Sequence, residues 1–287
     1  MKKKTCLITG GNSGIGKAAA TALVQLGHHV IIGCRNKDRG IQAQNEIEQI
    51  SKKECIDLLQ IDMSSQTSIR TAADHLKTNY NELDILIHNA ADFDLSRKSP
   101  VYTEDNIESV WATNHIGPVL LSNLLIDKLK ASSQGRVITV ASKGLMVHPF
   151  LKIRLADPEF RNGKFSVEKA YYQSKLAQVM YTYWLADFLK DTKVTANCIR
   201  VTNVKIDIGR YPNLYKTMRF MYSIKSSFSI TPEAMANTYV YLATSEDLQT
   251  MTGKYFDENN RMVTSSKYSR DWKHIQNLMK ITMEYLG

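Results

Sequence analysis

Tyr171 and Lys175 are four positions apart in a segment with the pattern of a helix. On a helix, this spacing places both side chains on one face. A free phenol has a pKa of about 10 and is a poor acid–base catalyst at neutral pH, but a lysine ammonium one turn away favours the phenolate and lowers that pKa. We therefore expect a proton-transfer site here. An aromatic ring packed on a lysine stem is the alternative, and for an isolated pair it is the more common arrangement.

A glycine-rich turn near the N-terminus has the composition of an anion site. The apolar run Cys6–Ile8 leads into a turn that contains Gly10, Gly14 and Gly16, and a helical pattern rich in alanine and leucine follows over residues 17–26. Glycines let the backbone turn sharply and approach phosphates, while N–H groups at the helix start face the anion. The turn predicts a binding site for a nucleotide pyrophosphate. The alternative is a turn that needs glycine for steric reasons alone.

Apolar runs rich in β-branched residues alternate along the chain with longer segments of helical period. The runs are residues 30–33, 55–61, 83–88, 136–141 and 194–201, and the helical segments include 37–50, 67–80, 104–130 and 168–189. Successive βα units of this kind form a parallel sheet with helices on both faces. The predicted fold class is α/β, a Rossmann-type doubly wound parallel sheet in a single three-layer αβα domain over residues 1–287. Ligands of such sheets bind beyond the carboxyl ends of the strands.

The spacing of the polar residues that follow these strands matches a family pattern. Residues 9–16 read T-G-x-x-x-G-I-G rather than the common G-x-G-x-x-G, and the residues that follow in order are Asn89, Asn114, Ser142, Tyr171 and Lys175. In this the chain resembles the short-chain dehydrogenase/reductase family over nearly its whole length, except residues 205–230. Within that family it most resembles the retinol dehydrogenase-like branch, and we expect it to lack the membrane anchor of that branch.

The resemblance implies an NADP(H)-dependent oxidoreductase that interconverts a carbonyl and an alcohol. Ser142 would orient the carbonyl, Tyr171 would donate the proton, and Lys175 would lower the Tyr171 pKa and hold the nicotinamide ribose. The backbone carbonyl of Asn114 would hold a water that links the lysine to solvent. Taken alone, Ser142 is also a common turn residue, and Gly117-Pro118 after Asn114 predicts a helix kink that could be purely structural.

Arg35 determines which cofactor we expect. An acidic residue after the second strand accepts hydrogen bonds from the adenosine ribose, whereas a basic residue pairs with a 2′-phosphate. Arg35 therefore favours NADP(H), with NAD(H) as the alternative; a solvated arginine with no binding role is the competing interpretation. The cofactor-binding residues implied by the resemblance are Gly10, Asn12, Ser13, Gly14, Ile15, Gly16, Arg35, Asp62, Met63, Asn89, Ala90, Tyr171, Lys175 and Val204. For Asp62, capping the helix that starts near Gln66 is the competing role.

The chain departs from the family pattern at two places that bear on catalysis. Ala91 stands where the family usually has glycine, and Val201-Thr202 stands where it has Pro-Gly before the backbone that binds the nicotinamide carboxamide. Val204 is the match to that carboxamide-binding position. These departures support a second interpretation, a dinucleotide-binding sensor or scaffold with weak or lost catalysis.

Residues 205–230 combine aromatic residues and methionines with lysines and arginines. In the family this region is a lid over the substrate, and adaptable apolar side chains suggest a bulky apolar aldehyde or ketone as the substrate. Peripheral contact with a membrane surface and contact between subunits are equal alternatives. Family members often form homodimers or homotetramers through helices like those near Glu104 and Glu168.

The composition argues against several other classes of protein. The 287 residues carry a formal net charge of +9, but the basic residues are dispersed and no nucleic-acid motif accompanies them, so we expect no nucleic acid partner. An anionic cofactor accounts for the sign. Cys6, Cys34, Cys55 and Cys198 lack metal or disulfide spacing, which predicts reduced thiols and no metal site. No apolar run is long enough for a signal peptide or a transmembrane segment, so we expect a cytoplasmic protein.

Overall fold

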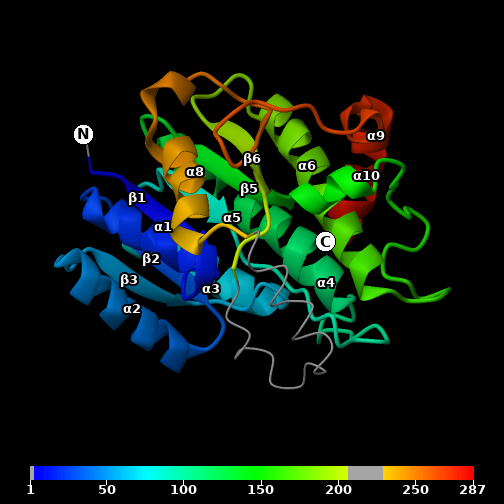
Figure 1. Cartoon of the computed structure of the whole chain (residues 1–287), viewed down its shortest axis with the longest axis horizontal. Helices are drawn as coiled ribbons and strands as arrows, with labels where there is room; N and C mark the ends of the chain where they lie inside the picture. Colours follow the sequence, from blue (N-terminus) through cyan, green and yellow to red (C-terminus); the bar gives the residue numbers. More distant parts are fainter. Residues whose placement is uncertain (1–2, 206–228) are drawn as a thin grey trace.

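The computed structural model describes residues 3–205 and 229–287. In these ranges, seven strands form one parallel sheet in the order β3-β2-β1-β4-β5-β6-β7 (Figure 1). The strands are β1 (Thr5–Thr9), β2 (His29–Cys34), β3 (Ile56–Gln60), β4 (Ile85–His88), β5 (Arg136–Ser142), β6 (Thr195–Val201) and β7 (Lys254–Phe256). The predicted doubly wound α/β sheet is confirmed. The predicted lid over residues 205–230 lies outside the described residues except at its two ends.

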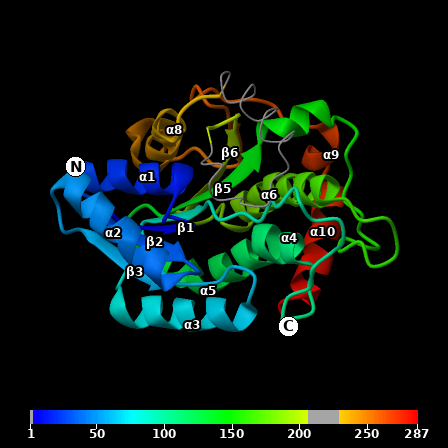
Figure 2. The ribbon, with the colours of Figure 1, turned by 60° about the horizontal axis from the view of Figure 1, so that its bottom comes forward.

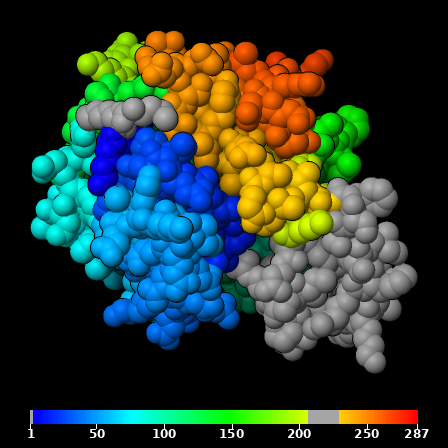
Figure 3. Space-filling view, turned by 60° about the vertical axis from the view of Figure 1, so that its left-hand side comes forward, coloured from blue at the N-terminus to red at the C-terminus, as the bar shows by residue number. Residues whose placement is uncertain are grey.

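Helices cover both faces of the sheet (Figure 2). One face carries α1 (Gly14–Gln25), α2 (Lys37–Ser51) and α8 (Pro232–Thr244), and Figure 3 shows α8 in amber beside α1 and α2 in blue. The other face carries α3 (Gln66–Asn79), α5 (Gly117–Ala131) and α6 (Val167–Phe188), with α10 (Trp272–Glu284) packed against α6. The shorter helical segments are α4 (Ser109–Trp111), the π-helix η1 (Ala112–Ile116), the 3₁₀ segments η2 (Lys143–Val147) and η4 (Glu246–Leu248), and α9 (Lys267–Arg270).

The central strand β1 shows why this sequence forms a sheet that is buried on both sides. Leu7 packs into the core beneath α3, α5 and α6, while Cys6 and Ile8 pack into the core beneath α1, α2 and α8, as the alternation of side chains along a strand requires. β1 pairs with both β2 and β4. The strand order therefore reverses at β1, and ligands of such sheets bind beyond the carboxyl ends of the strands on either side of that reversal.

The single long helix predicted over residues 104–130 is wrong in two respects. The helix begins at Ser109, and a π-helical turn over Ala112–Ile116 separates its first turn from α5. Pro118 has no N–H to donate to the carbonyl four residues earlier, which belongs to Asn114. The expected kink therefore takes the form of a wider π turn immediately before Gly117-Pro118, a distortion often found at functional sites.

Candidate active site

Most of the predicted site residues meet at the carboxyl edge of the sheet. Gly10 directly follows β1, Asn89 directly follows β4, and Ser142 is the last residue of β5. Helix α6, which packs against β5, brings Tyr171 and Lys175 to the same edge. The reversal of strand order and the candidate proton-transfer residues thus lie at the same edge of the sheet. A dinucleotide bound at the reversal would therefore lie close to Tyr171 and Lys175.

The glycine turn between β1 and α1 has no room for a side chain at Gly10 or Gly16. Gly10 and Gly14 have positive φ angles of 65° and 54°, a region that strongly favours glycine. A Cβ atom at Gly16 would lie 2.5 Å from the Gly10 carbonyl oxygen and 2.4 Å from Nδ2 of Asn89. The start of α1 carries no acidic residue in its first turn, and the side chain of Ser13 does not cap it. This arrangement suits an anion at the helix N-terminus.

The other residues predicted in this turn occupy supporting positions. Asn12 and Ser13 lie in the turn itself, and Ile15 is a partly buried residue of the first turn of α1 that packs on the core beneath α1, α2 and α8. Ala90 packs on the opposite core.

Asn89 holds the glycine turn in place. Its Nδ2 donates hydrogen bonds to the carbonyl oxygens of Thr9 (3.0 Å) and Gly10 (3.1 Å), and its Oδ1 accepts one from the Tyr239 hydroxyl (3.1 Å). The Thr9 hydroxyl oxygen accepts from the backbone N–H groups of Asn89 and Ala90, both at 3.1 Å. Thr9 and Tyr239 were not predicted as site residues. Tyr239 lies 150 positions from Asn89, so local sequence carries no signal for this contact.

Replacing Gly16 by alanine is expected to weaken both the fold and dinucleotide binding, because the new Cβ atom would meet a backbone carbonyl that cannot move aside. Overpacking of this kind costs about 1–3 kcal/mol. The control is Gly33→Ala, whose Cβ atom would meet a side-chain methyl of Ile61 at 3.0 Å. Thermal unfolding and NADPH titration measure both effects, and equal stability of the two variants with unchanged NADPH affinity would contradict the role of Gly16.

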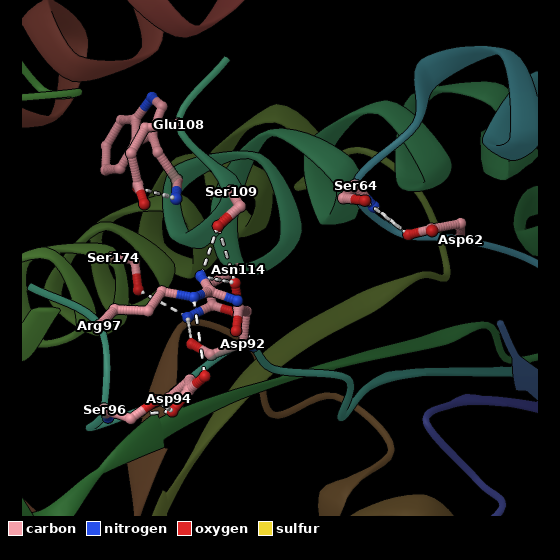
Figure 4. Close-up of polar contacts among 11 residues, drawn as sticks. Asp62, Ser64, Asp92, Asp94, Ser96, Arg97, Glu108, Ser109, Asn114 and Ser174 are labelled. Carbon is pink, nitrogen blue, oxygen red and sulfur yellow. Dashed lines mark hydrogen bonds and ion pairs between the residues drawn. The ribbon is translucent and has the colours of Figure 1, made fainter. Parts of the chain in front are cut away.

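The residues expected near the adenosine lie at the ends of β2 and β3. The Arg35 side chain is 78% exposed and its Nε is 3.9 Å from Oδ2 of Asp62, a loose ion pair. Oδ1 of Asp62 accepts hydrogen bonds from the backbone N–H (2.9 Å) and hydroxyl (2.7 Å) of Ser64 (Figure 4). The competing role of Asp62 as a helix cap is wrong, because the side chain of Ser65 caps α3. Met63 is buried beneath α3 and α5.

Asn114 is buried in the π turn, and its carboxamide joins three segments. Its Oδ1 accepts from the backbone N–H of Asp92 (2.7 Å), and its Nδ2 donates to the Asp92 carbonyl (3.1 Å) and to Oγ of Ser174 (3.0 Å). Figure 4 shows Asn114 between these two partners. The side chain therefore fixes the loop after β4 relative to α6, a role separate from that expected of its backbone carbonyl.

Asp92 and its hydrogen-bond partners were not predicted as site residues from the sequence. The Asp92 carboxylate accepts hydrogen bonds from Nη1 of Arg97 (2.6 Å) and from the Ser109 hydroxyl (2.9 Å), and Arg97 also donates to that hydroxyl (2.6 Å) (Figure 4). The aspartate follows Ala91, and nothing in its spacing relates it to Arg97 or Ser109. This small network anchors the loop on its outer side.

Tyr171 and Lys175 face the same region from the first turns of α6. The Nζ atom of Lys175 lies 5.6 Å from the centroid of the Tyr171 ring and donates a hydrogen bond to the Val140 carbonyl at 2.9 Å. Only 3% of Lys175 is exposed, and this burial lowers the pKa of its ammonium to about 8. The group is thus mostly protonated at neutral pH, and it titrates close to the physiological range.

Ser142 is the last residue of β5, and Val204 lies shortly after the end of β6. The Ser142 hydroxyl oxygen accepts from the Gly144 N–H at 3.1 Å and so caps the 3₁₀ segment that follows β5; the turn role considered from sequence is therefore present. Val204 forms a parallel bridge with Ile230, and the N–H of Lys205 donates to the Ile230 carbonyl at 2.9 Å. The two ends of residues 205–230 are therefore paired beside the end of β6.

These groups can bind an anionic dinucleotide and transfer a proton. The glycine turn and the start of α1 suit a pyrophosphate, while a phenol, a buried amine and a hydroxyl lie on the neighbouring strand and helix. Among residues 3–205 and 229–287, no group of three or more His, Cys, Asp or Glu side chains could hold a metal ion. The four cysteines are free thiols.

Comparison with known proteins gives consistent matches. A family model described as short chain dehydrogenase matches residues 4–151. Human retinol dehydrogenase 13 is 33% identical over 257 residues, which cover 88% of this chain and 76% of the relative. Mouse retinol dehydrogenase 12 is 33% identical over 284 residues, covering 99% of this chain and 86% of the relative.

Solved structures share the fold. A protein from Mycobacterium paratuberculosis superposes with a TM-score of 0.73 at 24% identity and covers 99% of this chain and 93% of its own. A short chain dehydrogenase from Shigella flexneri, solved with NADP, gives a TM-score of 0.66 at 20% identity and covers 89% of this chain and 97% of its own. Within the described ranges of the present structure, none of the helices has both the length and the apolar character needed to cross a bilayer.

Proposed function

The chain belongs to the short chain dehydrogenase family and is a carbonyl/alcohol oxidoreductase, and from that premise we propose that it uses NADP(H) to interconvert an apolar aldehyde or ketone and its alcohol. The observation that carries the proposal is the buried Lys175 amine beside the Tyr171 ring. Its relatives named retinol dehydrogenases support an apolar substrate.

The chain's own residues fit a dinucleotide. The glycine turn leaves no room for a Cβ atom at Gly16, and the first turn of α1 carries no acidic side chain that would repel phosphate. When bound, the reduced cofactor supplies the hydride that adds to the carbonyl carbon. Orientation of the carbonyl and transfer of the proton are carried out by side chains of the protein.

We assign the proton transfer to Tyr171. In the direction of reduction, its hydroxyl would donate a proton to the carbonyl oxygen of the substrate, which becomes the hydroxyl oxygen of the alcohol product. The Ser142 hydroxyl donates a hydrogen bond to the same oxygen and so orients the carbonyl. The Lys175 ammonium stabilises the phenolate that remains. Its hydrogen bond to the Val140 carbonyl keeps the amine on the side of α6 that faces β5.

Assays of NADPH oxidation with a panel of apolar aldehydes and ketones test the function. Turnover of at least one member of the panel is expected. The departures at Ala91 and Val201-Thr202 support the second candidate, a dinucleotide-binding sensor or scaffold. NADPH binding without turnover on any carbonyl would favour that candidate and would contradict the enzymatic proposal.

Replacing Arg35 by alanine is expected to weaken NADPH binding by about 10- to 100-fold, since a hydrogen bond between charged groups contributes about 1.5–3 kcal/mol. NADH lacks the 2′-phosphate, so its affinity should change little. The exposed Arg35 side chain and its loose pairing with Asp62 support its use for a ligand. The control is Lys130→Ala, which removes an exposed cation from the last turn of α5 and should leave the affinity for NADPH unchanged. Equal losses for NADPH and NADH would contradict the assignment.

We further propose that the protein works in the cytoplasm. The thiols of Cys6, Cys34 and Cys198 are reduced and buried, as is usual in reducing compartments. Fractionation of cells that express the full chain tests this location, and recovery in the membrane fraction alone would contradict it.

A further inference from the structure

Phe93 stacks on the ring of Tyr171. The two ring centroids are 4.0 Å apart and the ring planes are inclined by 26°. Phe93 belongs to the loop that leaves β4, whereas Tyr171 belongs to α6. Both rings pack against a small buried cluster formed by Val110, Phe160, Val167 and Ala170. The phenol ring is thus held between a second aromatic ring and the apolar cluster, with the Lys175 amine also within 5.6 Å of its centroid.

The two segments that carry this stacked pair are tied together by Asn114. Its carboxamide makes two hydrogen bonds to the backbone of Asp92, the residue before Phe93. The same carboxamide donates to Oγ of Ser174, and that hydroxyl donates to the Tyr171 carbonyl at 2.7 Å. One buried side chain therefore fixes the backbone beside each member of the pair, and Figure 4 shows Asn114 reaching both Asp92 and Ser174.

The loop is also anchored from outside. Arg97 and Ser109 bind the Asp92 carboxylate, which leaves the loop little freedom to carry Phe93 away from Tyr171. Exposed loops without such contacts open easily.

We propose that Phe93 is a positioning residue that holds the Tyr171 phenol in the geometry required for proton transfer, and that the Asn114 carboxamide keeps the two rings in register. The inference rests on the proposed function. A misplacement of about 1 Å in a reacting group can reduce a rate by about 100-fold. A flat ring stacked on the phenol limits such displacement, whereas a branched aliphatic side chain of similar volume does not.

The test is steady-state kinetics of carbonyl reduction by the full chain with NADPH. Phe93→Leu is expected to lower kcat by about 10- to 100-fold, with KM and the NADPH dissociation constant nearly unchanged. Phe93→Tyr keeps the flat ring and is expected to recover most of the loss. Phe165→Leu is the matched control, because Phe165 packs on the same cluster and its ring meets Phe160 rather than Tyr171.

Two outcomes would overturn the proposal. If Phe165→Leu lowers kcat as much as Phe93→Leu, the effect is loss of packing and not of position. If Phe93→Leu instead raises kcat/KM for bulky carbonyls, Phe93 covers substrate space. In a Tyr171→Phe background, Phe93→Leu should cause no further loss of rate, because no phenol remains to be positioned.

A second measurement separates this inference from the proposed function. If wild-type protein reduces no carbonyl, the proposed function fails, but a double-mutant cycle of urea unfolding with Phe93→Leu and Tyr171→Leu still measures the contact between the rings. The double variant is expected to lose less stability than the two single variants together. Strictly additive losses would show that the rings do not hold each other and would refute the inference without reference to turnover.

Discussion

Tyr171→Phe is expected to reduce the rate of carbonyl reduction by about 10²- to 10⁴-fold, the contribution typical of a general acid. The variant removes one hydroxyl and keeps the ring, so the stack with Phe93 and the packing of α6 are preserved. NADPH binding should change little. The loss should appear in kcat and in kcat/KM together, because the proton is needed only in the transition state.

Tyr172 provides the control for this substitution. Its ring centroid is 5.3 Å from that of Tyr171 and 4.5 Å from that of His148, and burial raises the pKa of its phenol. It lies against Gly144, where a Cβ atom would meet its ring and hydroxyl. Tyr172→Phe should retain nearly full activity. Normal turnover by Tyr171→Phe, or an equal loss in Tyr172→Phe, would show that the proton comes from elsewhere.

The fold could be predicted from the sequence because its signals are local. Each strand is a short apolar run, and in each covering helix the apolar residues recur with the period of a helix. The alternation of these two kinds of segment alone predicts a parallel sheet. The glycine turn is equally local, since its φ angles and close approaches concern residues 10–16. The glycine turn was expected at the carboxyl edge of the sheet, because ligands of such folds bind beyond the carboxyl ends of the strands.

The contacts that organise the site could not be predicted, because they join distant segments. Asn114 was expected to act through its backbone, yet its side chain binds Asp92 and Ser174, which lie 22 and 60 positions away. The stacking of Phe93 on Tyr171 depends on the path of a loop that has no periodic pattern. The π turn at Ala112–Ile116 was expected only as a kink, since Pro118 indicates a missing hydrogen bond but not how the helix absorbs it.

Lys175→Met is expected to abolish activity while making the unliganded protein more stable at pH 7. Burial lowers the pKa of Lys175 from the ordinary 10.5 to about 8, which corresponds to a penalty of about 3 kcal/mol for keeping the ammonium charged inside the fold. Methionine removes this penalty, but it also removes the hydrogen bond to the Val140 carbonyl, which contributes about 1 kcal/mol. A net gain of about 2 kcal/mol in the free energy of unfolding is expected, measured by urea denaturation.

The pH dependence of the free energy of unfolding distinguishes removal of the buried charge from better packing of the methionine. Between pH 8 and pH 10.5 the unfolded chain keeps the lysine proton and the folded protein has lost it, so the unfolded state binds more protons and stability rises with pH. The penalty is fully present below about pH 8 and is relieved as the pH approaches 10.5. The stability advantage of Lys175→Met over wild type should therefore be largest near neutral pH and shrink across this window. Lys169→Met, at an exposed position of the same helix, should show no such trend. A Lys175→Met advantage that stays constant with pH would mean that the amine has the same pKa in the folded and unfolded states, and the expected penalty for burying the ammonium would be wrong.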